Sequence, residues 1–220
     1  MRQKTKTAQA SFPQMLASFS IPASSQTHAT ANRSTSFNTL TLHHNKNIWV
    51  QTGYKLFADK GPHGLKVEVL AKQVGISKSS FYHHFADVEV FTTYLLQHHL
   101  DQTRLMAEQE RQCEKIDPHL ISVLVEHKTD LLFNRQLRVE RQNPVFQQCL
   151  SQSNAIAGHS FIEVWTRDLQ LKLAPHLMQG IFELALENFY LQITPDTLNQ
   201  AWLSAYFKNL ARIVASFRVA

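Results

Sequence analysis

Residues 66–85 read Lys-Val-Glu-Val-Leu-Ala-Lys-Gln-Val-Gly-Ile-Ser-Lys-Ser-Ser-Phe-Tyr-His-His-Phe, and this stretch decides the fold around it. Its apolar residues repeat at i, i+3, i+4 and i+7 from Val67 to Val74, which predicts a helix over about residues 66–74 with one buried face. Gly75 then supplies a tight turn, and Ser77 is a favourable N-cap for a second, short helix that ends near Phe85. Two short helices joined by a glycine turn predict a helix-turn-helix.

The second helix of this pair carries the polar groups that DNA recognition needs. Its first residues would approach base edges in the major groove, whereas Tyr82, His83 and nearby lysines would reach phosphates. The helix N-terminus adds a dipole that favours anions. The candidate DNA-binding residues are Lys66, Ser77, Lys78, Ser79, Ser80, Tyr82, His83 and His84.

The charge of the chain is uneven along its length. Its 220 residues include 22 Lys and Arg and 17 Asp and Glu, a formal net charge of +5. Residues 1–96 contain 10 basic and 4 acidic side chains, a net charge of +6, whereas residues 97–220 contain 12 and 13, a net charge of −1. This asymmetry favours an anionic partner for the first part, although a solvated basic surface would give the same count.

The first 44 residues are rich in Ser, Thr, Gln and Asn, contain no acidic residue and carry only scattered apolar side chains. Such a segment cannot bury enough surface to offset the entropy of ordering it, so a disordered tail is expected. An organelle transit peptide and a start codon placed too far upstream are alternatives. From Asn45 a helical pattern begins, and Lys60-Gly61 ends it. We therefore expect a tail over residues 1–44, a helix-turn-helix domain over 45–90 and a larger helical domain over 91–220.

Beyond residue 90 the pattern predicts long helices and no strand, so the expected fold class is all-α. Asp87 is a favourable N-cap for the first of these helices. Proline at the first helical position marks later starts. These starts are Asp117-Pro118, Asn143-Pro144, Ala174-Pro175 and Thr194-Pro195.

Several motifs resemble one known family, over about residues 46–96. Phe57-Ala-Asp-Lys-Gly61, Leu70-Ala71, Val74-Gly-Ile-Ser-Lys78 and Phe81-Tyr-His-His-Phe85 look like the N-terminal domain of TetR/AcrR-family transcription regulators. The resemblance implies a DNA-binding domain followed by a helical body, whose middle helices enclose a ligand pocket and whose last two helices form a dimer. It also implies a homodimer that binds double-stranded operator DNA, by default as a repressor, and that responds to a small apolar or amphipathic effector.

Two positions depart from the family pattern. The family often has Thr or Ser where this chain has Leu65 and Lys66, so a hydroxyl cap is missing and Lys66 would contact phosphate instead. The family also often has Lys where this chain has Val88, which cannot contact the DNA backbone. Either DNA affinity rests more on the recognition helix, or the chain belongs to a subgroup that docks differently.

Aromatic residues are frequent in the C-terminal half, and most are expected in the core. Those with polar neighbours in the middle helices are candidates for a ligand pocket, which gives Phe133, Asn134 and Trp165. The last two helices carry wide apolar faces, which would make a four-helix interface with their symmetry mates. The candidates for this dimer interface are Phe182, Phe189, Trp202 and Ile213.

Other classes of function find little support in the sequence. Paired histidines on a helix point about 100° apart and rarely bind one ion, so no metal site is expected. No glycine-rich phosphate loop or nucleophile motif indicates an enzyme or a cofactor. Two cysteines without CxxC spacing, no apolar run of about 18 residues and no signal-peptide core fit a cytoplasmic protein. A helix-turn-helix that packs on protein rather than DNA, and an activator rather than a repressor, remain as alternatives.

Overall fold

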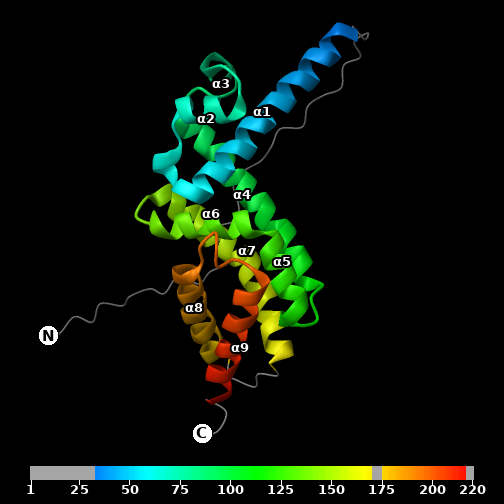
Figure 1. The fold of residues 1–220 in the computed structure, drawn as a ribbon, viewed down its shortest axis with the longest axis vertical. Coiled ribbons are helices and arrows are strands. Elements are labelled where there is room, and N and C mark those ends of the chain that lie inside the picture. Colours follow the sequence, from blue (N-terminus) through cyan, green and yellow to red (C-terminus); the bar gives the residue numbers. More distant parts are fainter. Residues whose placement is uncertain (1–32, 170–174, 217–220) are drawn as a thin grey trace, which may run out of the picture. The chain divides into compact units, whose positions relative to one another are not determined.

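The computed structural model describes residues 33–169 and 175–216, and within residues 33–45 and at 175 and 216 it describes the backbone only. Over these ranges the chain is helical and contains no strand, which confirms the all-α class (Figure 1). Contacts divide the chain between residues 38 and 39, and the second unit, residues 39–220, holds every site described below. No helix in the described ranges is both long enough and apolar enough to cross a membrane.

Helix α1 (Arg33–Lys60) is longer than the sequence pattern predicts. Its start was expected near Asn45, but residues 34–44 contain neither Gly nor Pro, so nothing there stops a helix that continues from the buried turns after Lys46. Residues 1–32 of the expected tail lie outside the described residues. The other end agrees with the prediction, because Gly61 has a φ of 66° and its N–H donates to Phe57 O at 2.7 Å.

The N-terminal half continues with a short 3₁₀ turn η1 (Pro62–Gly64), α2 (Val67–Val74) and α3 (Lys78–His84). Long α4 (Val88–Arg111) follows, then η2 (Ile116–Leu120), α5 (Ile121–Glu126), α6 (Lys128–Val139), α7 (Pro144–Asp168), α8 (Pro175–Gln192) and α9 (Gln200–Ser216). In the body, α4 packs along α7, α6 packs on α7, and α5 contacts α9. Helix α7 ends at Asp168, with Leu169 as its C-cap.

Two predicted helix starts are confirmed by their capping hydrogen bonds. Asp87 accepts a hydrogen bond from the Val90 N–H at 2.7 Å, which begins α4. Asn143 accepts one from the Val145 N–H at 2.9 Å, and Pro144 is the first residue of α7. A side-chain acceptor at these positions satisfies an N–H that has no partner within the helix.

The predicted start of the last helix at Pro195 is wrong, because α9 begins at Gln200. The intervening residues form a turn held by side chains, in which the Thr194 N–H donates to Thr197 Oγ1 at 2.7 Å. Asn199 then accepts a hydrogen bond from the Trp202 N–H at 3.0 Å. Asn199 therefore supplies the cap, and the proline belongs to the turn before it.

The core is aromatic where α1 meets the body. Phe57 on α1 stacks on Phe133 of α6 with ring centroids 4.2 Å apart, and Phe133 stacks in turn on Tyr54 at 4.4 Å. Phe57 and Phe133 are completely buried. Each buried phenyl ring contributes about 1.5–3 kcal/mol relative to an exposed one. These rings attach α1, and with it the helix-turn-helix, to the body.

Helix α1 crosses α4 at a residue without a side chain. A Cβ on Gly53 would lie 2.6 Å from Phe91 Cε1 and closer still to Cζ, inside the range of real carbon contacts. Phe91 is completely buried, and Leu95 Cδ2 would lie 3.4 Å from the same added Cβ. Glycine is therefore required here by close approach rather than by backbone conformation.

Candidate functional site

The helix-turn-helix expected from residues 66–85 is present as α2, a turn and α3 (Figure 1). Gly75 ends α2 in the left-handed region, with φ 75° and ψ 20°, and its N–H donates to Ala71 O at 2.9 Å. No atom outside its own backbone lies near the place of a Cβ, so the backbone conformation alone favours glycine. Ser77 occupies the N-cap position of α3 as expected, but its side chain makes no capping hydrogen bond.

Aromatic packing fixes the inner face of α3. Phe81 is completely buried, and its ring lies edge-on to Trp49 of α1 and to Phe91 of α4, with centroids 5.4 Å and 5.2 Å apart. Phe85 packs on Phe91 at 4.8 Å. Both neighbouring helices therefore hold α3, and its outer face is free to carry polar groups.

The candidate DNA-binding residues lie on that outer face and beside it. Tyr82 is 57% exposed, and Ser80 and His84 are half-buried. Burial, followed by the nearby His83 and Lys46, lowers the pKa of His84, which favours the neutral ring at neutral pH. The remaining candidates are all exposed: Lys66, Ser77, Lys78, Ser79 and His83.

One of these side chains already has a partner in the structure. Lys78 Nζ donates to Glu68 Oε1 of α2 at 3.1 Å, and both side chains are more than half exposed. A hydrogen bond from its own backbone amide, together with Lys78, lowers the pKa of Glu68. This pair links the two helices of the motif on the surface where DNA would lie, so Lys78 has to leave Glu68 to reach a phosphate.

The flanks of the motif agree with the two departures from the family pattern. Leu65 is 5% exposed, so its side chain packs into the core. Lys66 is the N-cap of α2 and makes no side-chain capping bond. Val88 is half-buried as the first residue of α4. At the same end of the domain, Lys46 Nζ lies 3.8 Å from the centroid of the Tyr94 ring, a cation–π contact.

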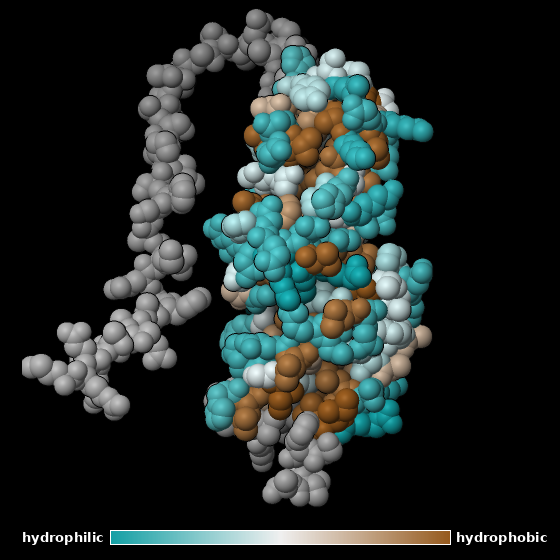
Figure 2. Space-filling view, turned by 90° about the vertical axis from the view of Figure 1, so that its left-hand side faces the viewer, coloured by the Kyte–Doolittle hydropathy of each residue, from teal (hydrophilic) through white to brown (hydrophobic). Residues whose placement is uncertain are grey.

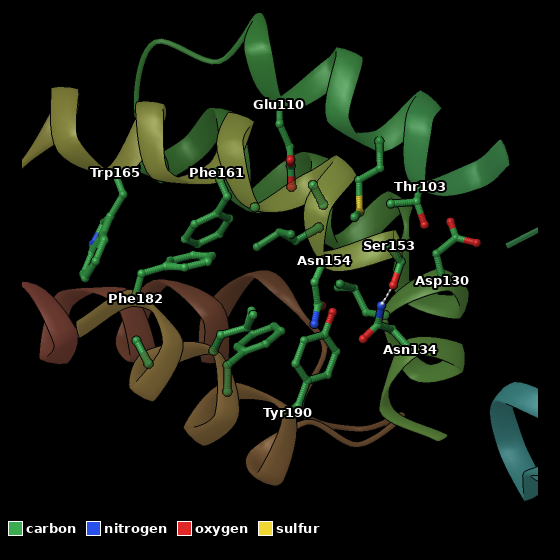
Figure 3. Close-up of a pocket in the computed structure, with 18 of the residues that line it drawn as sticks. Thr103, Glu110, Asp130, Asn134, Ser153, Asn154, Phe161, Trp165, Phe182 and Tyr190 are labelled. Carbon is green, nitrogen blue, oxygen red and sulfur yellow. Dashed lines mark hydrogen bonds between the residues drawn. The ribbon is translucent and has the colours of Figure 1, made fainter. Parts of the chain in front are cut away.

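A pocket lies in the body between α4, α6, α7, α8 and α9 (Figure 3). Asn134 and Trp165, two of the expected residues, line it, whereas Phe133 does not, because its ring lies in the stack between Tyr54 and Phe57. Most of the lining residues are apolar, and the aromatic ones among them are Phe161, Trp165, Phe182, Phe189, Tyr190, Tyr206 and Phe207. The polar lining residues are His99, Thr103, Glu110, Asp130, Asn134, Ser153 and Asn154, and among the described residues that line the pocket none is Lys or Arg.

Glu110 is a buried acid in the wall of this pocket. Its side chain is 1% exposed, extends from α4 toward the cavity in Figure 3, and accepts a hydrogen bond from Ser160 Oγ at 2.6 Å. Burial raises the pKa of Glu110 to about 7, although Ser160, His127 and Arg111 act in the opposite direction. The carboxyl group is therefore close to half-ionised at neutral pH.

A hydrogen-bonded network joins the pocket to α1. The Tyr54 hydroxyl donates to Asp130 Oδ1 at 2.7 Å and lies 2.9 Å from His99 Nδ1. Since the tyrosine proton goes to Asp130, His99 Nδ1 must carry a hydrogen, which leaves Nε2 as an acceptor. Burial lowers the pKa of His99 to about 4, so the ring is neutral at neutral pH. His127 Nδ1 lies 2.6 Å from the second oxygen of Asp130.

Asn134 continues this network along the wall. Ser153 Oγ donates to Leu150 O at 3.0 Å, so it accepts from Asn134 Nδ2 at 2.9 Å, the bond drawn in Figure 3. The same amide nitrogen lies 3.4 Å from His99 Nε2. Asn134 Oδ1 is therefore the acceptor end of the amide, and it is buried without a hydrogen-bond partner. Trp165 Nε1 is also buried without a partner, but Figure 3 shows it on the side of the indole away from Phe161.

The candidate dimer residues fall into different environments. Phe182 and Phe189 are each 7% exposed and line the pocket, so they pack inside the subunit. Trp202 is half-buried and stacks on Tyr206 at 5.2 Å, while Ile213 is 49% exposed. The most exposed apolar side chains of α8 are Leu177, Leu184 and Leu191, at 52%, 75% and 79%. Figure 2 shows apolar side chains among hydrophilic ones on the face that carries α8.

Sequence reasoning named Asn134 but missed the polar pocket residues of α4, although this helix contains a signal for them. Its buried stripe runs Phe91, Leu95, His99, Thr103, Met106 and Glu110, at steps of three or four residues. Three polar residues on an otherwise apolar stripe have to find partners inside the protein. The structure describes no group of three or more His, Cys, Asp or Glu side chains that could hold a metal ion within its ranges.

Comparisons with known proteins agree with this geometry. Residues 50–89, from α1 to the first turn of α4, match the model of bacterial regulatory proteins of the tetR family. A Mesorhizobium loti protein described as a TetR-family transcriptional regulator superposes with a TM-score of 0.53 at 14% identity, covering 80% of this chain and 97% of that chain. A Rhodococcus protein with the same description gives a TM-score of 0.47 at 17% identity, covering 74% and 96%. No curated protein matches the chain. Residues 50–89 are therefore similar to the DNA-binding domain of bacterial regulatory proteins of the tetR family, and the chain as a whole shares its fold with the Mesorhizobium loti protein.

Proposed function

We propose that this chain is a transcription regulator that binds operator DNA as a homodimer through α3 and releases it when a small molecule occupies the pocket. The observation that carries the proposal is the construction of α3. Its inner face is fixed by Phe81 against Trp49 and Phe91, and its outer face presents Lys78, Tyr82 and neighbouring polar groups. A rigid short helix with exposed hydrogen-bonding side chains can enter the major groove and read base edges.

The proposed dimer uses α8 together with α9. Leu177, Leu184 and Leu191 are seven residues apart, so they lie along one side of α8, and all three are more than half exposed. Gly180 lies between the first two and has no atom near the place of a Cβ, which leaves room for a second helix to approach. Because two copies related by a twofold axis present the same stripe, the contact is self-complementary. The dimer would place two α3 helices about 34 Å apart, one turn of DNA.

The proposed response to a ligand uses the network at Tyr54. His99 and Asp130 line the pocket, and both hydrogen-bond to Tyr54 of α1. A ligand that moves either side chain therefore acts on α1, which holds α3 through Trp49. The ligand shifts DNA affinity only as far as it binds one arrangement of α1 better than the other. Release of DNA makes the chain a repressor, acting in the cytoplasm where the DNA is.

The proposal is tested by selecting sequences from random DNA duplexes with the full chain. We expect a twofold-symmetric site to be enriched and its affinity to fall steeply with salt, because bound phosphates release counterions. The double variant Lys78→Ala, Tyr82→Ala should lose this affinity while remaining dimeric, and Lys115→Ala, an exposed lysine between α4 and η2, is the matched control. No enriched sequence together with binding that is indifferent to salt would show that the helix-turn-helix packs on protein instead.

A further inference from the structure

We propose that the pocket takes an amphipathic amine, a molecule with an apolar body and a protonated nitrogen that donates to the Glu110 carboxylate. The inference rests on the proposed function, since it names the class of effector for the same pocket. It is carried by the charges of the described lining residues, by the single described hydrogen bond of the Glu110 carboxyl group, and by a buried Asn134 oxygen without a described partner.

The lining of the pocket selects the sign of the ligand's charge. Within the part of the chain that the structure describes, two lining residues have carboxyl side chains, Glu110 and Asp130, and none is Lys or Arg. Arg138 is nearby but is not among the described lining residues: its guanidinium donates to Glu187 and Asn154 through its two terminal nitrogens, lies over the Tyr190 ring at 4.3 Å, and keeps its Nε buried without a described partner. A carboxylate or phosphate ligand would meet buried acids without a cation, which is unfavourable in a site of low dielectric.

Of the two acids, Glu110 is the one that needs a partner. Asp130 accepts from Tyr54 and has His127 at its other oxygen. Glu110 has one described hydrogen bond, from Ser160, although a carboxylate accepts up to about four. A buried ionised carboxylate is stable only when it is paired and hydrogen-bonded. An ammonium group supplies both a counter-charge and donors, so it binds the ionised form selectively.

The titratable groups around Glu110 do not supply that counter-charge by contact. Arg111 follows it on α4, His127 lies between α5 and α6, Tyr190 comes from α8, and Cys113 lies just beyond α4. Burial raises the pKa of Glu110 to about 7, above its ordinary value of 4.5, and Ser160, His127 and Arg111 offset this rise only in part. An ammonium ligand should therefore bind better as pH rises through about 7, and its arrival should release the proton of Glu110.

A second free acceptor favours a ligand rich in N–H or O–H groups. Asn134 gives its amide hydrogens to Ser153 and His99, and its Oδ1 remains buried without a partner. Figure 3 shows this amide beside Tyr190 and Asn154, at the opposite end of the pocket from Trp165. The apolar part of the wall includes Met106, Phe161 and Phe182, of which Phe161 and Phe182 lie toward Trp165 in Figure 3, and these side chains suit an alkyl or aromatic body.

The test compares isosteric ligands on the full chain by calorimetry, at about pH 8 where Glu110 is ionised and the amine is still protonated. The first set is decylamine, decanoic acid and decan-1-ol, and the second is tryptamine, indole-3-propionic acid and 3-ethylindole. We expect one amine per chain to bind at least about tenfold tighter than its acid and neutral counterparts. We also expect its affinity to rise between about pH 6 and pH 8, with release of a proton.

The variants assign the effect to one carboxyl group. Glu110→Gln keeps an acceptor for Ser160 and should lower amine affinity about tenfold, abolish the pH dependence and leave the alcohol within about twofold. Glu108→Gln, an exposed acid on the same helix, is the matched control and should change nothing. Equal binding of amine, acid and alcohol would overturn the proposal without any variant, and so would an amine affinity that survives Glu110→Gln. Neither result affects the selection of DNA sequences, so failure of this inference and failure of the proposed function are separate outcomes.

Discussion

The hydroxyl of Tyr54 on α1 donates a hydrogen bond to Asp130 on α6 at 2.7 Å, across 76 positions of sequence. Both residues are buried, and Asp130 lines the pocket whereas Tyr54 does not. The same hydroxyl oxygen lies 2.9 Å from His99 Nδ1. One side chain of the helix that carries Trp49 and Phe57 is thus bonded to two residues of the pocket wall.

Tyr54→Phe should weaken the link between the pocket and α1. The variant leaves the ring stacked on Phe133 but removes a partner from Asp130 and from His99, which should cost about 1–2 kcal/mol of unfolding free energy. Decylamine should then change operator affinity by a smaller factor than in the wild type. The two measurements are urea denaturation and operator binding with and without the amine. Tyr94→Phe, which removes a hydroxyl from an exposed ring, is the control, and an unchanged response in Tyr54→Phe would contradict the proposed route.

Glu110 should make the protein less stable as pH rises. Its folded pKa of about 7 lies above its ordinary value of 4.5, so the folded state holds a proton that the unfolded chain has lost. The stabilising contribution of this group is complete below about pH 4.5, declines as pH rises and is lost above about pH 7, a total on the order of 3 kcal/mol. Glu110→Gln should remove this decline, as measured by urea denaturation from about pH 4 to pH 8. Parallel curves for both proteins would show that Glu110 titrates normally.

Freeing Lys78 should strengthen DNA binding. Glu68→Gln removes the partner of Lys78 and an acidic charge from the surface of the motif, so operator affinity should rise several-fold at low salt. Lys78→Ala should lower it and reduce the slope of log affinity against log salt by about one. Filter binding at a series of salt concentrations measures both effects. A Glu68→Gln protein that binds DNA no better than the wild type would indicate that Lys78 stays away from phosphates.

Gly53→Ala should destabilise the helix-turn-helix domain. The added Cβ would overlap the ring of Phe91, and overpacking of this kind typically costs about 1–3 kcal/mol despite the better helix propensity of alanine. Gly158→Ala on α7 is a matched control, because its Cβ would meet Phe182 at an ordinary 3.7 Å. It should therefore be neutral or gain up to about 1 kcal/mol. Thermal denaturation of the two variants gives the comparison, and equal stability would mean that α1 and α4 separate easily.

Leu184→Glu should dissociate the proposed dimer. The residue is 75% exposed in the chain and lies in the middle of the α8 stripe, so a carboxylate there would face its own copy across the twofold axis. Sedimentation should show monomers, and operator affinity should fall by orders of magnitude because each half-site is then bound alone. Leu105→Glu, at an equally apolar exposed position on α4, is the control and should remain dimeric. A dimeric Leu184→Glu protein would place the interface elsewhere.

Local signals predicted the helix-turn-helix well. The turn at Gly75 needs a left-handed residue, and the caps at Asp87 and Asn143 bond to amides within three residues, so neighbours in sequence determine them. The helix start predicted at Pro195 was wrong because proline fits a turn as readily as a first helical position. The capping hydrogen bond of Asn199 shows that Pro195 belongs to the turn.

The pocket depends on contacts that a single sequence does not show. Phe133 and Asn134 are adjacent on α6, yet Phe133 lies in the core and Asn134 lines the cavity. Phe133 packs on the aromatic rings of α1, whereas Asn134 hydrogen-bonds to Ser153 of α7. Phe182 and Phe189 were assigned to the dimer for their apolar character, but that character equally suits a pocket wall. Exposure of Leu184 and Leu191 becomes visible only when α8 is placed against its neighbours.

Tyr54 reaches the pocket without being part of the surface that a ligand touches. In the proposed function, the apolar wall at Phe161 and Phe182 on α7 and α8 would contact the body of the ligand, whereas the contacts of Tyr54 with His99 and Asp130 would transmit occupancy to α1. Substitutions in those walls should therefore change the specificity of the sensor while the transmission to DNA remains intact. The fold is suited to reprogramming, in which one DNA-binding output is combined with new chemical inputs.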